Sequence, residues 1–262
     1  MLWRALSWLK QKLDERVQKF VIRVLSAGPV PKHVAFVMDG NRRYARANHM
    51  KVQQGHSDGF VALRRLLGIC LQLNVRCVSV YAFAIDNFKR PSEEVDALMA
   101  LAEAKLRELC QHGDLLQQYG VRLNVIGRVD MLPESVREAV RVAEDLTRHN
   151  DRAILNLCMP YASRDEMTRA VQDAAQEKID LGTRNTMVEE KDIEKHLMTS
   201  VAGSPPLDVL VRTSGVQRLS DYMLWQSCEG VQLHFSTTYW PEFGLSDFLP
   251  IILDYQRKQW CL

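Results

Sequence analysis

An aspartate and two arginines directly follow a short apolar stretch near the start of the chain. Residues 34–38 are uninterrupted apolar residues, and Asp-Gly-Asn-Arg-Arg occupies residues 39–43. A carboxylate can hold a hard cation, while loop amides, a helix N-terminus and guanidinium groups bind phosphate oxygens. The segment therefore suits a metal–diphosphate group. A strand-to-helix turn with a capping asparagine and solvated arginines explains the same residues equally well.

Two further apolar stretches end in polar and basic residues of the same kinds. Residues 78–84 and 209–211 are the stretches, and the polar residues after them are Asp86, Asn87, Arg90, Arg212, Thr213, Ser214, Arg218 and Ser220. In parallel α/β sheets, ligands bind at the carboxyl ends of the strands. Three strand ends that each supply an arginine therefore favour a cleft for phosphorylated ligands over a solvated surface.

The elements that must position these residues alternate between strands and helices. Strands are predicted at 34–38, 78–84, 121–126, 153–159, 209–211 and 231–235, and helices at 58–72, 92–109, 134–149, 164–178, 188–198, 219–226 and 246–256. Ser92, Ser163 and Ser246 are the expected N-caps of three of these helices. The alternation predicts a single α/β domain with a central, mostly parallel six-stranded sheet flanked by helices.

The composition excludes several other classes of protein. The 262 residues are 47% hydrophobic and carry a formal net charge of +2, so nothing in the overall charge indicates nucleic acid as a partner. The six cysteines form no CxxC pair, which predicts reduced thiols and a cytosolic compartment. No apolar stretch is long enough to cross a bilayer, and early charges argue against a signal peptide. Walker A, GxGxxG and GxSxG motifs are absent.

Residues 1–27 are predicted to form an N-terminal amphipathic helix in front of a catalytic domain at 28–262. Apolar residues recur at spacings of three and four, at Leu2, Leu6, Leu9, Leu13, Val17, Phe20 and Val24. The helix either packs on the protein or a partner, or lies on a membrane surface with its tryptophans and basic residues at the headgroups.

Several segments together resemble the cis-prenyltransferase family of undecaprenyl diphosphate synthases, and more closely the eukaryotic dehydrodolichyl diphosphate synthase catalytic subunits. They are residues 33–45, Gly-His-Ser at 55–57, residues 81–90, Arg-Thr-Ser-Gly at 212–215, residues 218–226 and Tyr-Trp-Pro-Glu at 239–242. They occur in the order of the family and cover about residues 30–245. The resemblance implies Mg²⁺-dependent condensation of isopentenyl diphosphate onto an allylic diphosphate, presumed to be farnesyl diphosphate, to give a long-chain polyprenyl diphosphate for dolichol synthesis.

The resemblance also implies a role for each matched residue. Asp39 would bind Mg²⁺ and assist loss of the allylic diphosphate, and Asn87 would lie beside the reacting carbons. The allylic diphosphate would be held by Gly40, Asn41, Arg42, Arg43, His56 and Arg90. The diphosphate of isopentenyl diphosphate would be held by Arg212, Arg218 and Ser220. A hydrophobic tunnel is expected for the growing product, because each added isoprene unit buries five carbons, worth about 4 kcal/mol.

The sequence departs from the family pattern at several positions. Ala84 stands where relatives often have serine, Asp86 replaces the usual glutamate, and Val216 stands where many relatives have glutamate. An extra residue within 227–232 leaves Glu229 only a candidate for the second metal ligand of bacterial relatives.

The C-terminal region lacks the Arg-x-Gly motif with which homodimeric relatives complete the isopentenyl diphosphate site. Arg257 has no glycine two residues after it. The resemblance therefore implies a hetero-oligomer in which a Nogo-B receptor-like subunit supplies this motif, located peripherally at the cytosolic face of the endoplasmic reticulum membrane. The alternative is a non-catalytic scaffold subunit of the same fold, against which the intact residues 39–43 and 212–220 argue. A hydrolase using Asp39 as nucleophile would need a second carboxylate where Asn41 stands.

Overall fold

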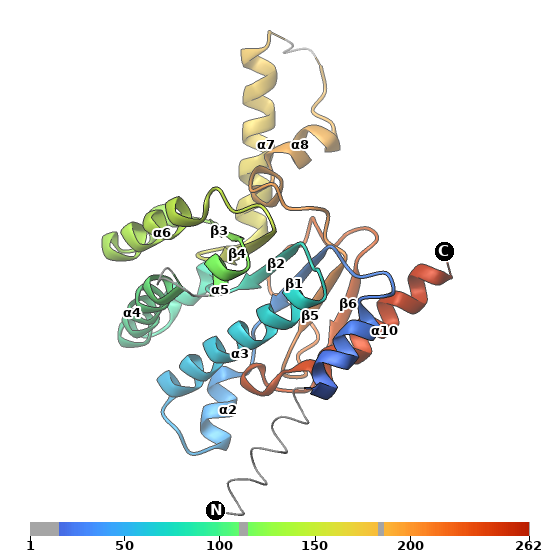
Figure 1. Cartoon of the computed structure of the whole chain (residues 1–262). Coiled ribbons are helices and arrows are strands. Elements are labelled where there is room, and N and C mark those ends of the chain that lie inside the picture. Colours follow the sequence, from blue (N-terminus) through green and yellow to red (C-terminus); the bar gives the residue numbers. More distant parts are fainter. Residues whose placement is uncertain (1–15, 110–114, 183–185, 262) are drawn as a thin grey trace, which may run out of the picture.

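A six-stranded sheet lies at the centre of the computed structural model, which describes residues 16–109, 115–182 and 186–261 (Figure 1). The strands are β1 (His33–Val37), β2 (Cys77–Tyr81), β3 (Val121–Ile126), β4 (Ala153–Cys158), β5 (Val209–Arg212) and β6 (Gln232–Phe235). Their order is β3-β4-β2-β1-β5-β6, and all five neighbouring pairs are parallel. The prediction of a single α/β domain around a six-stranded sheet is confirmed.

Helices and short 3₁₀ segments connect the strands. They are α2 (Asn41–Ala47), α3 (Val52–Gln72), η1 (Ile85–Lys89), α4 (Ser92–Leu109), α5 (Leu115–Gln118), η2 (Val129–Met131), α6 (Glu134–Thr147), α7 (Ser163–Asp180), α8 (Glu190–His196), α9 (Met198–Val201), η3 (Trp240–Glu242) and α10 (Leu245–Trp260). In Figure 1, α7 extends well beyond the sheet and α8 lies beside it. Within the described residues, no helix is both long and apolar enough to cross a membrane.

The two faces of the sheet are covered differently. Every residue of β1 is buried, and its side chains alternate between the faces as the strand period requires. Val34 and Phe36 join a large core with residues of α3, α4, α6 and α10, whereas Ala35 and Val37 join a smaller core with Tyr222 and Met223. Irregular backbone at residues 219–223 therefore covers part of the second face, together with Met198 of α9.

Residues 16–25 are helical and present apolar side chains on two sides. Ile22 and Leu25 are buried, and the carbonyl of Leu25 accepts a hydrogen bond from Gln256 of α10 at 2.7 Å. Val17, Phe20 and Val24 of the predicted apolar stripe are instead exposed. Leu2, Leu6, Leu9 and Leu13 lie outside the described residues. The described part of the helix therefore both packs on the protein and leaves the predicted stripe uncovered.

Candidate active site

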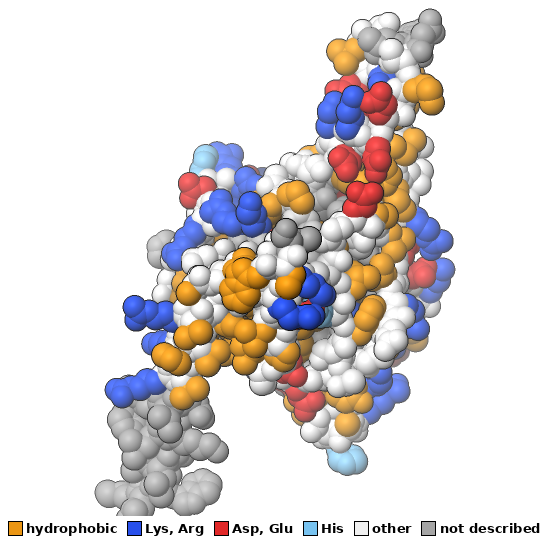
Figure 2. Space-filling view, turned by 90° about the vertical axis from the view of Figure 1, so that its right-hand side faces the viewer, with side chains coloured by type: hydrophobic (Ala, Val, Ile, Leu, Met, Phe, Trp, Pro, Cys, Tyr) orange, Lys and Arg blue, Asp and Glu red, His pale blue; other side chains and the backbone are white. Residues whose placement is uncertain are grey.

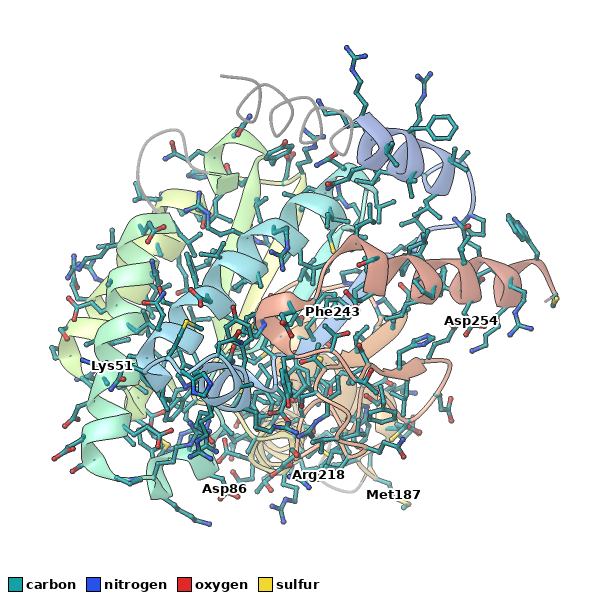
Figure 3. The ribbon with its side chains drawn as sticks, turned by 90° about the horizontal axis from the view of Figure 1, so that it is seen from below. Lys51, Asp86, Met187, Arg218, Phe243 and Asp254 are labelled. Carbon is teal, nitrogen blue, oxygen red and sulfur yellow. The ribbon has the colours of Figure 1, made fainter. Side chains whose placement is uncertain are left out.

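The three predicted strand ends meet at one edge of the sheet. β1 lies between β2 and β5, and the three strands are parallel, so the segments after them leave the sheet side by side. Figure 3 shows Asp86 and Arg218, which follow β2 and β5, at the same edge of the molecule. A cavity of about 1280 Å³ lies there. Its lining includes all the predicted site residues: Asp39, Gly40, Asn41, Arg42, Arg43, His56, Asn87, Arg90, Arg212, Arg218 and Ser220.

Asp39 connects the first of these segments to the third. Its Oδ1 accepts a hydrogen bond from the backbone N–H of Gly40 at 2.7 Å, and its Oδ2 accepts one from the Arg212 guanidinium at 2.9 Å. Burial alone would raise the pKa of Asp39, but the hydrogen bond and charge of Arg212 outweigh it, and the pKa is lowered. Asp39 is therefore a carboxylate at neutral pH.

Thr213 fixes the backbone on both sides of the Asp39 side chain. Its hydroxyl accepts a hydrogen bond from the N–H of Asp39 at 3.0 Å and donates to the carbonyl of Asp39 at 2.7 Å. The Thr213 side chain is completely buried. The position of the carboxylate is thus set by a side chain that follows β5.

The turn from β1 to α2 requires glycine at residue 40. Gly40 is the N-cap of α2 with φ of +104°, and a Cβ there would meet Tyr239 at 2.8 Å. Asn41 was predicted as the capping residue, but it is the first residue of the helix, and its Nδ2 donates to the carbonyl of Met38. The loop therefore owes its shape to Gly40 rather than to an asparagine cap.

Arg43 spans the distance between this loop and the segment after β5. Its guanidinium donates to the hydroxyl of Ser214 at 2.5 Å and to the Ser214 carbonyl at 3.2 Å, and it lies 5.6 Å from the centre of the Tyr239 ring. It also lies 3.5 Å from Oδ1 of Asp39. Its charge is thereby held over the β1 loop.

His56 lines the cavity from the first part of α3, a helix that begins earlier than predicted. The sequence predicted this helix from about residue 58, but it starts at Val52 and therefore includes Gly55 as well as Gly59. A Cβ at Gly55 would meet the Asn41 carbonyl oxygen at 2.4 Å, and one at Gly59 would meet its side-chain oxygen at the same distance. The glycines therefore let α3 pack closely against the start of α2.

The His56 ring lies in a cationic and mostly buried position. Its Nε2 is buried and has no hydrogen-bond partner among the described residues. Burial first, and then the charges of Arg90 and Arg42, lower the pKa of His56 to about 4. The ring is therefore neutral at pH 7.

Glu94 organises the residues that follow β2. It accepts a hydrogen bond from Arg90 at 3.0 Å and lies 3.6 Å from the Arg42 guanidinium, so one carboxylate holds two arginines. Arg90 also donates to the side-chain oxygen of Asn87 at 2.8 Å. The orientation of the Asn87 amide is thus tied to the arginine beside it. The expected cap, Ser92, is the first residue of α4.

Arg212, Arg218 and Ser220 form a second cluster of anion-binding groups. The hydroxyl of Ser220 accepts hydrogen bonds from Arg212 at 2.7 Å and from Arg218 at 3.2 Å. The helix predicted at 219–226 is wrong, because Ser220, Asp221 and Met223 have positive φ angles and the segment forms irregular turns.

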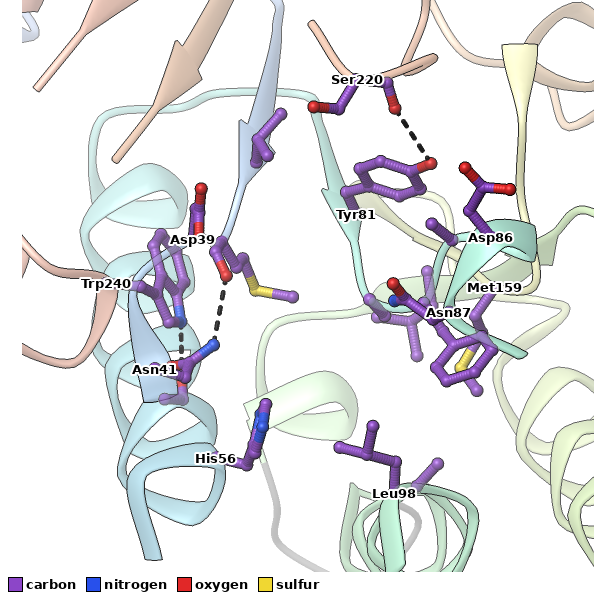
Figure 4. A pocket seen from close by; sticks show the side chains of 18 of the residues that line it. Asp39, Asn41, His56, Tyr81, Asp86, Asn87, Leu98, Met159, Ser220 and Trp240 are labelled. Atoms are coloured by element: carbon purple, nitrogen blue, oxygen red, sulfur yellow. Dashed lines mark hydrogen bonds between the residues drawn. The ribbon is translucent and has the colours of Figure 1, made fainter. Parts of the chain in front are cut away.

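The cavity has a charged side and an apolar side. Eight basic and four acidic side chains line it, so a large share of positive charge is gathered here in a chain whose formal net charge is only +2. Apolar side chains from α3, α4 and the ends of β2 and β4 line the rest, including Leu63, Leu98, Leu106 and Met159. Figure 4 shows Asp39 and Asn41 on one side of this space, with Asn87, Leu98 and Met159 on the other. The cavity therefore suits a ligand with an anionic head and a hydrocarbon tail.

The donor set around Asp39 fits Mg²⁺ held jointly by the protein and a diphosphate. No cluster of three or more His, Cys, Asp or Glu side chains with metal-binding geometry occurs in the described part of the chain. Mg²⁺ is commonly bound by one or two carboxylates together with substrate phosphates, so the ionised Asp39, with lone pairs left after its two hydrogen bonds, is sufficient. Glu229 lies with Glu189, Glu190 and Glu194 at a separate shallow pocket, which does not favour it as a second ligand.

Sequence patterns gave little indication of Glu94, Tyr81 and Asp221 as parts of the site. Glu94 is one of two acidic residues in the first turn of α4, and Tyr81 and Asp221 lie inside segments matched to the family without a role of their own. The sequence could have indicated Glu94 through its position four residues after Arg90, because side chains at this spacing lie next to each other on a helix.

Comparison with known proteins shows the family to which the chain belongs. The family profile of undecaprenyl diphosphate synthases matches residues 37–261. A dehydrodolichyl diphosphate synthase complex subunit of Schizosaccharomyces pombe is 43% identical over 250 residues, which cover 95% of this chain and 94% of the relative. A dehydrodolichyl diphosphate synthase complex subunit of Homo sapiens is 39% identical over 256 residues, which cover 97% of this chain and 75% of the human protein. The crystal structure of lavandulyl diphosphate synthase from Lavandula x intermedia in complex with dimethylallyl diphosphate superimposes with a TM-score of 0.80 at 32% identity, covering 87% of this chain and 95% of that one. The chain belongs to the cis-prenyltransferase family, that of the undecaprenyl and dehydrodolichyl diphosphate synthases.

Proposed function

We propose that the chain catalyses Mg²⁺-dependent addition of isopentenyl diphosphate units to farnesyl diphosphate, giving a long-chain dehydrodolichyl diphosphate. The observation that carries this proposal is the hydrogen bond between Asp39 and Arg212, which joins two cationic clusters at the mouth of an apolar cavity. The names of the relatives, dehydrodolichyl diphosphate synthase complex subunits, support the product class.

The two clusters divide the work of one condensation. Arg42, Arg43 and Arg90, with the amides at the start of α2, bind the allylic diphosphate, so that its C1–O bond breaks as negative charge moves onto the leaving group. The double bond of isopentenyl diphosphate, held through Arg212 and Ser220, supplies the electron pair for the new bond to C1. Loss of a proton from C2 of the isopentenyl unit to the released diphosphate or to water then restores an allylic diphosphate five carbons longer.

Asp39 is the residue that would hold the metal ion. A Mg²⁺ ion held by this carboxylate would supply positive charge to the leaving diphosphate. Two diphosphates close together repel each other strongly, since two unit charges 4 Å apart repel by about 4 kcal/mol at an effective dielectric of 20. Arg212, bonded to Asp39 and Ser220, keeps a buried guanidinium between the two anionic groups.

We further infer that the chain is the catalytic subunit of a hetero-oligomer with a Nogo-B receptor-like partner. Two curated relatives are named as complex subunits. The edge strand β6 and helix α10 expose apolar side chains, at Leu233, Phe235, Leu253 and Trp260, which supports a protein interface there. Figure 2 shows the side toward which the end of α10 points in Figure 1, with hydrophobic side chains at its surface.

The exposed stripe of residues 16–25 supports a peripheral location at the cytosolic face of the endoplasmic reticulum membrane. Val17, Phe20 and Val24 point outward and are accompanied by Lys19 and Arg23, a pattern suited to an anionic bilayer surface. Replacing the three apolar residues by serine should reduce binding to vesicles containing phosphatidylserine severalfold, without altering thermal stability. Unchanged vesicle binding would refute the membrane role.

The experiment that tests the function measures incorporation of radiolabelled isopentenyl diphosphate into lipid-extractable product. The purified chain is assayed with farnesyl diphosphate and Mg²⁺, with and without the partner subunit, and products are resolved by length. We expect little product from the chain alone and long polyprenyl diphosphates from the mixture. Absence of product under both conditions would favour the scaffold alternative, and full turnover by the chain alone would refute the need for a partner.

A further inference from the structure

The segment from Ser220 to Met223 has a backbone that its own sequence does not favour. Ser220, Asp221 and Met223 have φ angles of +52°, +61° and +46°. Residues other than glycine rarely adopt this left-handed region, and such conformations persist only where the surroundings impose them. Ser220 is one of these residues, so the position of its hydroxyl depends on whatever holds the segment in place.

Asp221 makes several of the contacts that hold this segment in place. Its Oδ1 accepts a hydrogen bond from the backbone N–H of Arg164 at 2.9 Å, and its Oδ2 accepts one from Nε of the same residue at 3.0 Å. Its backbone carbonyl accepts the N–H of Ser163 at 2.8 Å. The N-cap residue of α7, Ala162, offers no side-chain oxygen, so Asp221 takes the role of a capping residue from a distant part of the chain.

Further contacts complete the attachment on both sides of Asp221. The hydroxyl of Ser163 accepts the N–H of Leu224 at 2.9 Å, so it bonds to this segment instead of capping its own helix as predicted. Tyr81 donates from its hydroxyl toward the Ser220 carbonyl at 3.3 Å (Figure 4). The buried Tyr222 ring stacks on that of Tyr81 with centres 4.5 Å apart. The first turn of α7 and the end of β2 together hold the Ser220 backbone.

We propose that Asp221 is a positioning residue for the second diphosphate, acting through Ser220; this proposal rests on the proposed function. Without the Asp221 carboxylate, the segment can relax toward right-handed φ angles, and the Ser220 hydroxyl leaves Arg212 and Arg218. Within the described part of the chain, the Asp221 carboxylate is bonded to Arg164, whereas the arginines of the allylic side contact Glu94 and Ser214. The effect therefore falls on one substrate.

The test compares Asp221→Ala and Asp221→Asn in the full chain, with the partner subunit added where the wild type needs it. Asp221→Ala should raise the KM for isopentenyl diphosphate about tenfold, equivalent to about 1.4 kcal/mol, with the KM for farnesyl diphosphate changed less than twofold. Asp221→Asn keeps an acceptor for the Arg164 N–H and should raise the KM for isopentenyl diphosphate only about threefold. Asp130→Ala, which removes an exposed carboxylate paired with Arg128, is the matched control and should change neither KM.

A merely structural role for Asp221 predicts a different result. Equal changes in both KM values, or loss of active enzyme with unaltered KM values, would overturn the proposal. If Asp221→Ala does not fold, the partial and substrate-selective effect of Asp221→Asn decides the question. If the wild type incorporates no isopentenyl diphosphate, the proposed function fails, and calorimetric titration of isopentenyl diphosphate into wild type and Asp221→Asn still tests Asp221: affinity weakened about threefold supports it, and equal affinity refutes it.

Discussion

Replacing Asp39 by asparagine tests the centre of the site with the smallest change of shape. The substitution removes the negative charge and keeps one side-chain oxygen, which can replace the acceptor of Gly40 or that of Arg212 but not both. We expect kcat to fall by about 10²- to 10³-fold, or roughly 3–4 kcal/mol in transition-state stabilisation, because the leaving diphosphate loses its metal-binding carboxylate. The measurement is incorporation of labelled isopentenyl diphosphate at saturating concentrations of both substrates and Mg²⁺.

The same substitution should also lower stability, for a reason visible at Arg212. This guanidinium is only 4% exposed, and Asp39 is the carboxylate that neutralises it. Removing one partner of a buried ion pair costs about 3–5 kcal/mol. Since Asp39 is 31% exposed and the amide still accepts a hydrogen bond, we expect about 2 kcal/mol, measured by urea unfolding. Inorganic pyrophosphate without Mg²⁺ should stabilise the variant more than the wild type, because it returns negative charge to Arg212.

Asp86→Asn is the matched control, since Asp86 lines the same cavity. Its side chain is 77% exposed and pairs with Lys89, so its loss should change kcat less than threefold and leave stability unaltered. If Asp39→Asn keeps more than a tenth of the wild-type kcat, or if Asp86→Asn loses as much, the assignment of Asp39 as the metal-binding carboxylate is refuted.

Two further substitutions follow from contacts around the cavity and the sheet. Glu94→Gln frees Arg42 and Arg90 from the carboxylate that holds them, and should raise the KM for the allylic diphosphate about fivefold, or about 1 kcal/mol, measured at saturating isopentenyl diphosphate. A change in the KM for isopentenyl diphosphate instead would contradict this placement. Burial lowers the pKa of His33 from 6.5 to about 4, so the folded state resists protonation. Stability present above pH 6.5 should be lost as the pH falls toward 4, by up to about 3 kcal/mol from His33. His33→Gln should lose less stability than the wild type between pH 7.5 and 4.5 in urea unfolding, and an equal loss would exclude His33 as the cause.

The strands and the edge of the sheet at which they end could be predicted from sequence because parallel strands buried on both faces are short, continuous apolar stretches. β1 illustrates this, since all five of its residues are buried and the polar residues begin two positions later. The same pattern extended β2 too far, to residue 84, whereas the strand ends at Tyr81. Beyond Tyr81 the pairing is irregular, with an isolated parallel bridge between Ala84 and Tyr161, and Phe83 is apolar because it is a core residue.

The parts that were missed depend on contacts between distant residues. Gly55 lies before the helix predicted at 58–72, but it is inside α3, where the lack of a Cβ lets this helix approach the Asn41 carbonyl oxygen. The spacing of apolar residues at 219–226 suggested a helix, yet Tyr222 and Met223 are buried against the sheet from a left-handed backbone. The capping of α7 is a further example, because the backbone N–H of Arg164 donates to the side chain of Asp221 and not to that of the predicted cap, Ser163. Local propensity cannot show which of two distant oxygens reaches a helix end.

The hydrogen bond between Asp39 and Arg212 makes the two diphosphate clusters parts of one network. Asp39 accepts from Gly40 on the allylic side, Arg212 donates to Ser220 on the isopentenyl side, and Thr213 joins the two backbones. Because the new bond forms between carbons whose diphosphates are bound by different clusters, their separation must be set accurately. The direct bond between a buried guanidinium and the Asp39 carboxylate fixes that separation with side chains from two adjacent strands.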